Sequence, residues 1–580
     1  MPENIYGLQY GQYGNTEAII AYKKGIILQA NNYTNKGTAF SDDERYRLNL
    51  IGAMPPSMRP LEMQVINSAD KVAGKEDDIE RFIYIRSLFD RNVTLAHALV
   101  KSDIERYMKI IYTPTVGLAC QRYSSMYRHS NGIHFYPGNI DQAENIMRRF
   151  VHRNIRVAVV TDNQGILGIG DQGAGGIAIC LGKLMLYTQG AGIAPWHCLP
   201  ISLDVGTDNK ELLDDPFYLG WRHERIRGDE YLQFVQRFAK AFRAVFPNAL
   251  CQWEDFSKQN AFAIRDSYLH DLISFNDDIQ GTGSVTLAAI LTGMKIKKEK
   301  ITDQRYLIHG AGAGGVGIAE QIETAMIEEG LPEEEARSRI YTLDSRGLVT
   351  SDRSLEPYKE KFAKDPSQIS WLKESADNTL ENVIKNENIT VLIGTSGQQG
   401  CFTEQIVKAV HQNTDRPMIL PLSNPTANCE ALPEDIYKWT DGKALVATGS
   451  PFAPVEYGGS TFHIGQCNNV FVFPGVGLGI IASGAKEVLP SFFTAAAKAV
   501  SESVSEEAMV KGELVPPVDE LQNVSLKVAQ KVGETAIAAQ VGHLCAFSDY
   551  QHNNAPERLR ELIMNMRWQP EYLPLIRETH

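Results

Sequence analysis

Two pairs of adjacent acidic residues stand where short apolar runs end, and they are the first candidates for chemistry. Glu254 and Asp255 lie in WEDF, and Asp277 and Asp278 lie in FNDDIQGT, ahead of a helix-like segment. A buried acid needs a partner, and oxygen ligands from two strand ends suit Mg²⁺ or Mn²⁺, which leave positions for water and a chelating substrate. For Asp277 or Asp278, a helix N-cap is the alternative.

A lysine within an apolar segment is the next candidate. Lys183 lies in GGIAICLGKLMLY, about three turns into the helix that the glycine-rich stretch 165–176 opens. Glycines let a backbone approach a ligand closely, so this stretch and Lys183 together indicate a substrate side. The alternative is a surface lysine whose stem covers apolar neighbours while its ammonium reaches water.

The chain carries two matches to G-x-G-x-x-G, at Gly168 to Gly173 and at Gly310, Gly312 and Gly315. A dinucleotide loop should follow a strand, open a helix and be followed by an acid at the end of the next strand. The downstream match meets these conditions, because RYLIH precedes Gly310 and Asp344 closes YTLD. We therefore predict that it binds a dinucleotide; a glycine-tightened turn is the alternative.

The elements that must position these residues form an α/β fold. Helical spacing dominates residues 76–112, short β-branched runs alternate with helix-like segments from about 155, and helical texture returns from about 485. We predict a mainly helical region at 1–130, an α/β domain with the acids and lysine at 131–279, completed by 467–540, a Rossmann-type domain at 280–466, and a C-terminal tail at 541–580.

Composition excludes several classes of function. The 580 residues carry a net charge of −13, which argues against a nucleic-acid or anionic-membrane partner, and no apolar stretch reaches the roughly 20 residues of a membrane span. The eight cysteines show no paired spacing, and the first residues lack a secretory signal pattern. We expect a cytoplasmic protein that acts on a small molecule.

Specific motifs give the chain a family resemblance. They are YTPTVG at 112–117, VVTD with ILGIGDQG at 159–173, LDVGT at 203, WEDF, FNDDIQGT, GAGAGGVGIAE, LSNPT at 422, ATGSPF at 447 and QCNNVFVFPG at 466. With this set, spread over most of its length, the chain resembles the malic enzymes, which oxidatively decarboxylate L-malate to pyruvate. The resemblance implies a nicotinamide cofactor, Mn²⁺ or Mg²⁺, and a homodimer or homotetramer.

The resemblance also implies roles for individual residues. Lys183 matches the family's base and Tyr112 its acid, while the metal ligands match Glu254, Asp255 and Asp278. A free lysine has a pKa near 10.4, so burial or the nearby metal must lower the pKa of a lysine base. The family's substrate and nicotinamide contacts match Asn424 and Asn468, for which a turn-forming asparagine is the alternative.

One position departs from the family pattern. Malic enzymes usually carry an arginine where this chain has Gly165, so a bidentate contact to a substrate carboxylate is lost. The malolactic enzymes, which convert malate to lactate and CO₂, resemble the chain here. We favour malic enzyme activity and keep malolactic activity as the alternative. Four arginines are candidates to replace the missing charge: Arg91, Arg122, Arg128 and Arg156.

The residues after the strand YTLD bear on the choice of cofactor. Asp344 at its end could bind an adenosine ribose, which favours NAD, but Arg346 and Lys359 follow it. NADP-preferring malic enzymes resemble this arrangement, with a base in the position of Lys359. The sequence thus leans slightly to NADP over NAD, and solvated surface bases are the alternative reading of both residues.

Overall fold

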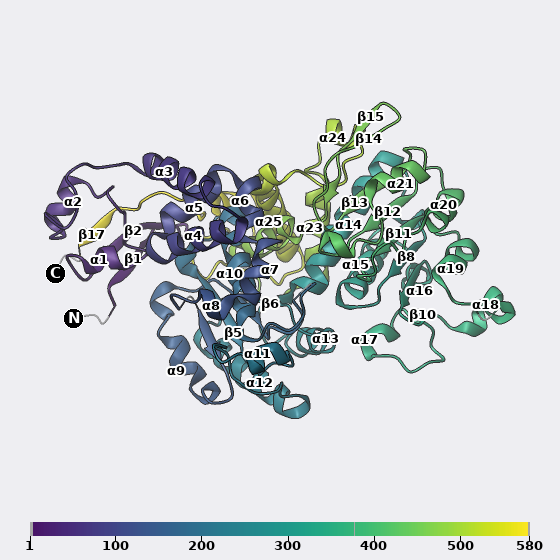
Figure 1. Cartoon of the computed structure of the whole chain (residues 1–580), viewed down its shortest axis with the longest axis horizontal. Helices are drawn as coiled ribbons and strands as arrows, with labels where there is room; N and C mark the ends of the chain where they lie inside the picture. Colours follow the sequence, from purple (N-terminus) through teal and green to yellow (C-terminus); the bar gives the residue numbers. More distant parts are fainter. Residues whose placement is uncertain (1–3, 131, 167, 376, 578–580) are drawn as a thin grey trace.

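The computed structural model describes residues 4–130, 132–166, 168–375 and 377–577. Helices and parallel strands alternate through most of the chain, which confirms the α/β fold class. The two ends of the chain lie together at one end of an elongated molecule, and the residues from 306 to 448 form the opposite end (Figure 1). None of the helices within those ranges has the length and apolar character required to cross a bilayer.

The amino-terminal region joins a small sheet to a group of helices. Strands β1 (Tyr6–Tyr10) and β2 (Thr16–Ala21) pair antiparallel, and β17 (Leu575–Arg577), from the far end of the chain, pairs parallel with β2. Phe40 and Leu575 are buried in the core beneath this sheet. The helices of the region are α1 (Ile27–Ala30), α2 (Asp42–Arg47), α3 (Leu61–Ala73), α4 (Asp78–Arg91), α5 (Val93–Ser102), α6 (Ile104–Ile111), α7 (Thr115–Gln121) and α8 (Tyr123–Met126).

A five-stranded parallel sheet follows. Its strands are, in spatial order, β3 (Ile133–Phe135), β5 (Cys198–Leu203), β4 (Val157–Thr161), β6 (Leu250–Glu254) and β7 (Ser274–Asn276). Every residue of β4 is buried, as the β-branched run VAVVT predicts for a central strand covered on both faces. The helices near this sheet are α9 (Ala143–Arg148), α10 (Ile177–Leu186), α11 (Lys210–Asp214), α12 (Gly228–Val245) and α13 (Lys258–Ser267).

A seven-stranded sheet forms the other end of the molecule. Its order is β10 (Gly347–Leu348), β9 (Ile340–Asp344), β8 (Tyr306–His309), β11 (Val391–Gly394), β12 (Met418–Pro421), β13 (Leu445–Thr448) and β16 (Gly465–Gln466). All neighbours are parallel except β10 and β9. Its helices are α15 (Ala313–Glu328), α16 (Glu333–Ser338), α17 (Pro357–Glu360), α18 (Ser370–Ser375), α19 (Leu380–Glu387), α20 (Glu404–Asn413) and α21 (Pro433–Trp439).

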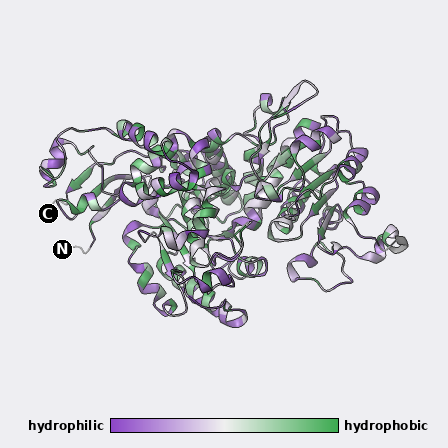
Figure 2. Cartoon of the chain, in the orientation of Figure 1, coloured by the Kyte–Doolittle hydropathy of each residue, from purple (hydrophilic) through white to green (hydrophobic). Residues whose placement is uncertain are grey.

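Long apolar helices connect the two sheets. They are α14 (Thr282–Lys297), α22 (Phe473–Ser483), α23 (Pro490–Ser501) and α25 (Leu521–Ala538), and they lie in the middle of the molecule (Figure 1). Apolar residues dominate this middle layer and the strands, while the outer helices carry many hydrophilic residues (Figure 2). Side chains bond across the layer, since Ser284 Oγ donates to Phe493 O at 2.7 Å and Gln321 Nε2 to Thr494 Oγ1 at 2.7 Å.

The rest of the carboxyl-terminal part returns to the amino-terminal region. It contains a hairpin of β14 (Val455–Tyr457) and β15 (Ser460–Phe462), then α24 (Glu506–Val510) and α26 (Pro556–Asn565). Trp568 packs edge-on against Trp196 with ring centroids 5.4 Å apart, and its backbone N–H donates to Gly192 O at 2.8 Å. These contacts hold the carboxyl-terminal segment close to the end of α10, the helix that contains Lys183.

Candidate active site

Five of the residues singled out in the sequence come from separate elements around the carboxyl edge of the five-stranded sheet. Tyr112 directly follows α6, and Lys183 lies in α10. Glu254 ends β6 and Asp255 follows it, while Asp278 lies in η6 (Asp277–Gly281), a π-helical turn between β7 and α14. Because the strands are parallel, the ends of β6 and β7 lie side by side, and this places the two acidic pairs together.

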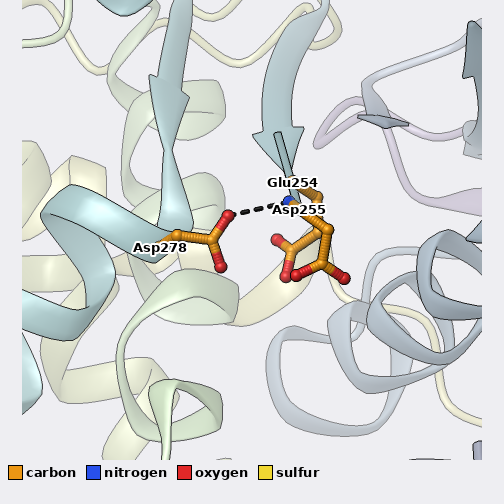
Figure 3. A group of neighbouring side chains, drawn as sticks. All are labelled: Glu254, Asp255 and Asp278. Carbon is orange, nitrogen blue, oxygen red and sulfur yellow. Dashed lines mark hydrogen bonds between the residues drawn. The ribbon is translucent and has the colours of Figure 1, made fainter. Parts of the chain in front are cut away.

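The three proposed metal ligands form one cluster. Glu254, Asp255 and Asp278 each offer a carboxylate oxygen, and these oxygens all lie within 4.8 Å of one another. Figure 3 shows Asp278 facing the other two across the gap between the strand ends. The N–H of Asp255 donates to Asp278 Oδ2 at 2.7 Å, and Asp255 has a left-handed φ of 56°. A backbone conformation that side chains rarely adopt is thus held beside the acids, as is common at ligand sites.

The three carboxyl groups repel one another in a buried place. Burial raises the pKa of Glu254 to about 8, with Asp278 and Asp277 adding to the rise and Lys183 opposing it. Burial, opposed by Lys183, also raises the pKa of Asp278 to about 6, and burial with the neighbouring acids raises the pKa of Asp255 well above its usual range. A divalent cation offers such a cluster the charge it lacks, and a set of three oxygen donors suits Mg²⁺ or Mn²⁺.

Lys183 is fully buried against two of the acids. Its ammonium donates to Asp277 Oδ2 and lies 2.9 Å from Glu254 Oε1, so it is no surface lysine. It also lies 4.7 Å from the centroid of the Phe473 ring and 5.6 Å from that of Tyr112. Burial alone would lower the pKa of Lys183, but the attraction of Asp277 and Glu254 outweighs it and holds this pKa well above the usual value. With these carboxylate partners alone, the pKa of Lys183 is not lowered, as the sequence predicts that it must be for a lysine base.

The aromatic ring of Tyr112 is buried close to the same ammonium. Burial raises the pKa of the Tyr112 phenol, which Lys183 opposes, so the phenol keeps its proton at neutral pH. A protonated hydroxyl beside a buried ammonium is suited to donate a proton.

Sequence reasoning missed the role of Asp277. This side chain, which lies one position before a proposed metal ligand, is the ion-pair partner of Lys183 and also accepts from Asn469 Nδ2 at 3.0 Å. Asn469 bonds in addition to Asp277 O and to Thr282 Oγ1, both at 3.1 Å. The adjacent acids in FNDDIQGT were the available signal, because successive residues of a turn can point to different neighbours.

The two asparagines expected to meet the substrate lie in different loops. Asn468 caps the short helix η10 (Asn469–Phe471) by accepting from Val470 N at 3.0 Å, and it directly precedes the partner of Asp277. Asn424 follows β12 and accepts from Ser450 Oγ at 2.6 Å. A Cβ on Gly168 would lie 2.7 Å from Pro425 Cδ, so the upstream glycine loop touches the loop that carries Asn424.

The downstream glycines are required by close packing. Gly310 has a φ of 121°, and a Cβ on it would lie 2.5 Å from Thr395 C; a Cβ on Gly315 would lie 2.0 Å from Gly310 O. A Cβ on Gly312, at the start of α15, would lie 3.3 Å from Lys258 Cε and 3.6 Å from its Nζ. The lysine that opens α13, three residues after Asp255, therefore lies over the amino end of α15, where a pyrophosphate would bind. No sequence motif identifies Lys258 as a candidate.

The acid at the end of β9 is surrounded by bases. Asp344 Oδ1 accepts from Arg353 at 3.0 Å, and Oδ2 accepts from Lys359 Nζ at 3.2 Å. Lys359 is buried and also lies 2.9 Å from Glu356 Oε2, whereas Arg346 is exposed and donates to Ser354 O at 3.0 Å. Lys359 thus forms ion pairs with two carboxylates, those of Asp344 and Glu356.

Comparison with known proteins decides the family. A family model described as "Malic enzyme, N-terminal domain" matches residues 89–269, and one described as "Malic enzyme, NAD binding domain" matches residues 279–537. The chain belongs to the malic enzyme family. This result confirms the resemblance read from the motifs, and it makes the chain an oxidoreductase of the malic enzyme type.

Curated malic enzymes align with nearly the whole chain. The NAD-dependent malic enzyme of Shewanella sediminis is 43% identical over 540 residues, which cover 93% of this chain and 94% of the relative. That of Shewanella oneidensis is 44% identical with the same coverage. These relatives give no support to the malolactic alternative.

Solved malic enzymes share the fold. The enzyme from Pyrococcus horikoshii has a TM-score of 0.53 at 24% identity, covering 80% of this chain and 89% of that one. The Entamoeba histolytica enzyme has a TM-score of 0.54 at 22% identity, covering 89% and 92%.

Gly165, the departure from the malic enzyme pattern, is closed to any side chain. Its N–H donates to Asp255 O at 2.6 Å, and a Cβ on it would lie 2.2 Å from Phe256 O. The loop at 165 therefore packs directly on the segment that bears a proposed metal ligand. An arginine could not enter here unless this loop moved.

The arginines offered as replacements lie in varied places. Arg156 is buried, donates to Gly14 O and lies over the Phe547 ring, and Arg91 lies over the Tyr84 ring. Arg122 and Arg128 are exposed. A fifth arginine, Arg225, does reach the loop, with Nε 2.6 Å from Asp171 Oδ2 and a bond of 2.8 Å to Asp162 O. It holds both ends of the loop that contains Gly165.

Proposed function

We propose that the chain catalyses the oxidative decarboxylation of L-malate to pyruvate and CO₂, with Mn²⁺ or Mg²⁺ and with NAD as the hydride acceptor. The observation that carries the proposal is the convergence of Lys183, Tyr112 and three carboxyl groups in one buried cluster. Such a cluster supplies a base, an acid and a cation site within reach of one small substrate.

Glu254, Asp255 and Asp278 would hold the cation. Their oxygens are close enough to share one ion, and their raised pKa values mark a cluster that lacks positive charge. The chemistry supplied by a divalent ion in this place is Lewis-acid stabilisation of the negative charge that develops on the substrate oxygens.

Lys183 and Tyr112 would divide the proton transfers. Oxidation removes the C2 hydroxyl proton and a hydride from C2, and loss of CO₂ then leaves an enolate that needs a proton at C3. Lys183 would take the first proton, for which it must be a neutral amine. A cation held by Glu254, Asp255 and Asp278 would offset the carboxylate charge that raises the pKa of Lys183, and Asp277 is placed to stabilise the ammonium that forms. Tyr112, with its phenol held protonated, delivers the second proton.

Asn424 and Asn468 would contact the substrate, with Asn424 also near the nicotinamide. Neither amide carries charge, and the backbone at Gly165 leaves no room for an arginine side chain. The divalent cation would therefore contribute more to binding of the substrate carboxylates than it would in a site with a bidentate arginine. Arg225 donates hydrogen bonds to Asp162 and Asp171 and so stabilises the loop that contains Gly165.

The loop Gly310 to Gly315 and Lys258 would bind the cofactor pyrophosphate, and Asp344 the adenosine ribose. The sequence leaned to NADP because of Arg346 and Lys359. The pairing of Lys359 with Asp344 and Glu356, and the names of the relatives, shift our proposal to NAD. NADP stays the alternative, since Arg346 is exposed beside Asp344.

A product assay tests the proposal. The protein is incubated with L-malate and Mn²⁺ and with NAD or NADP, and pyruvate, lactate, CO₂ and reduced cofactor are measured. We expect pyruvate, CO₂ and NADH in equal amounts, and no turnover after chelation. Lactate without reduced cofactor would replace the proposal by malolactic activity, and oxaloacetate without CO₂ would replace it by simple dehydrogenation.

We also propose a cytoplasmic homodimer or homotetramer. The cysteines are free thiols, which suits a reducing compartment, and large apolar side chains are exposed at Ile51, Met63 and Ile66. Light scattering on the purified protein distinguishes these states from a monomer.

A further inference from the structure

A fully buried carboxyl group that has no part in the proposed mechanism lies between two loops of the seven-stranded sheet. Glu430 follows the short helix η9 (Thr426–Asn428) and precedes α21, and its side chain has no exposed surface. The loops are those that leave β11 and β12 at the carboxyl edge of the sheet.

Glu430 accepts four hydrogen bonds from these loops. Its Oε1 receives Ser396 N at 2.9 Å, Ser396 Oγ at 3.1 Å and Ser423 Oγ at 2.5 Å. Its Oε2 receives Ser423 N at 3.3 Å. No ion pair with a basic side chain is found for Glu430 in the described part of the chain. The carboxylate is therefore stabilised by neutral donors of two separate loops, and it fixes one loop relative to the other.

Further contacts show that the loops are shaped around this side chain. A Cβ on Gly394, the last residue of β11, would lie 2.5 Å from Glu430 Cδ, so only glycine leaves room for the carboxyl group. Ser423 Oγ, while donating to Glu430, accepts from Gly397 N at 2.8 Å. Phe402 N donates to Glu430 O at 2.9 Å, which closes the same loop from its other end.

The position of the two loops connects them with the cofactor. The chain runs from β8 to β9 on one side and returns to β11 on the other side of β8, so the sheet reverses its winding between β8 and β11. In open parallel sheets, ligands bind in the crevice at such a reversal. Thr395 Oγ1 donates to Gly310 O at 2.8 Å across this crevice, and Asn424 directly follows Ser423.

We propose that Glu430 is a positioning residue for the dinucleotide: it holds the loop after β11 against Gly310 and sets the loop that carries Asn424. The inference rests on the proposed function for the identity of the cofactor. A carboxylate that served only the core would lower stability when replaced and would leave cofactor affinity unchanged. A positioning carboxylate alters cofactor affinity more than it alters metal affinity.

Glu430→Gln is the main test variant. The amide keeps one acceptor oxygen for the three bonds to Oε1 but turns a donor toward Ser423 N, so the bond from Ser423 N is lost and the charge on the remaining acceptor is removed. We expect the KM for NAD and the dissociation constant of NADH, measured by fluorescence without turnover, to rise about tenfold, as the loss of a hydrogen bond to a charged group implies. The Mn²⁺ affinity should stay within about twofold, since the metal ligands lie on the other sheet.

Glu387→Gln is the matched control. Glu387 lies at the amino edge of the same sheet, where its carboxylate accepts from Arg305 at 2.5 Å, Trp371 Nε1 at 2.8 Å and Tyr341. We expect this variant to lose thermal stability and to keep the NADH affinity of the wild type.

Equal changes in NADH affinity in both variants, or no change in Glu430→Gln, would overturn the proposal. If Glu430→Gln does not fold, Ser423→Ala and Ser396→Ala remove single donors, and unchanged NADH affinity in both would overturn it equally. A wild type that binds NADH but does not oxidise malate would refute the proposed function alone, because the binding assay still tests Glu430.

Discussion

The carboxyl edges of the two parallel sheets carry opposite kinds of electrostatics. At the five-stranded sheet, Glu254, Asp255 and Asp278 crowd together with raised pKa values and with Lys183 as their buried cation. At the seven-stranded sheet, Glu430 is surrounded by donors from both flanking loops. One edge is a charged cluster that gains from binding a cation, and the other is a set of loops already fixed by its own hydrogen bonds.

The difference teaches what each edge does for catalysis. Reacting groups need unbalanced charge close to the substrate, and such charge is costly to bury until the ligand arrives. A cofactor site needs backbone groups in the right places, and these can be fixed in advance at little electrostatic cost. We therefore expect variants at the first edge to affect turnover strongly and variants at the second to affect cofactor affinity.

The largest effect should follow from Lys183→Ala, which removes the base from the first edge. We expect kcat for malate oxidation to fall about 100- to 10,000-fold, the usual contribution of a general base. NADH binding, which depends on the other sheet, should remain near that of the wild type. The two edges are separated by measuring kcat in a Mn²⁺-saturated assay and NADH affinity by fluorescence; turnover near the wild-type rate would remove Lys183 from the mechanism.

Loss of a metal ligand should come next. Asp278→Ala should weaken Mn²⁺ binding by about 10- to 100-fold or more and lower activity at subsaturating Mn²⁺ in proportion. Loss of a residue that only supports a metal ligand already has an effect of about this size, and loss of the ligand itself should have no smaller one. Asp255→Ala and Glu254→Ala should behave alike. The control is Glu404→Gln, an exposed acid of α20 paired with Lys408. Unchanged Mn²⁺ affinity in all three cluster variants would make the cluster structural.

The pH dependence of stability gives a third, smaller signal. The pKa of Glu254 lies at about 8 in the fold and near 4.5 in an unfolded chain, and the pKa of Asp278 is raised to about 6. The folded protein therefore holds more protons than the unfolded chain between about pH 4.5 and 8, so these groups make the metal-free fold less stable as the pH rises through that window.

Mn²⁺ should reverse this loss, since it binds the ionised acids. We expect the increase in Tm caused by Mn²⁺ to be larger at pH 8 than at pH 5.5, and a concentration 100 times the Kd to contribute about 2.7 kcal/mol. Comparing Tm with Mn²⁺ and with chelator at each pH cancels the titration of groups outside the cluster. An increase independent of pH would contradict the raised pKa values.

The sequence predicts most of the first edge but less of the second. Glu254 ends one short apolar run and Asp278 follows another, and the alternation of such runs with helix-like segments predicts parallel pairing, so their meeting was predictable. The pairing of Lys183 with Asp277 was not, because it depends on how the π-helical turn η6 directs two adjacent acids. Glu430 carried no local signal, since its role arises from donors 34 and 7 positions earlier in the chain.

Substitutions of the residues that would bind the cofactor should have the smallest effects. Lys258 tests binding of the pyrophosphate, and Lys359 tests the choice between NAD and NADP. Lys258, near Gly312, faces the pyrophosphate position that NAD and NADP share. Lys258→Gln should therefore raise the KM of both cofactors several-fold and equally, with an effect that shrinks as salt is added because the side chain is exposed. A change in only one cofactor's KM would place Lys258 elsewhere.

Lys359→Gln tests the choice between the cofactors. Lys359 is buried and shared between Asp344 and Glu356, so a 2′-phosphate must compete with two carboxylates for it. If the 2′-phosphate displaces one of these carboxylates, it gains a charge-assisted hydrogen bond from Lys359 of at least about 1.5 kcal/mol, which corresponds to about tenfold in the affinity for NADP. We expect the substitution to lower kcat/KM for NADP by up to about tenfold and to leave that for NAD within about twofold. Wild-type preference for NADP would restore the expectation drawn from the sequence, whereas an equal loss for both cofactors would show that Lys359 serves Asp344 and not the phosphate.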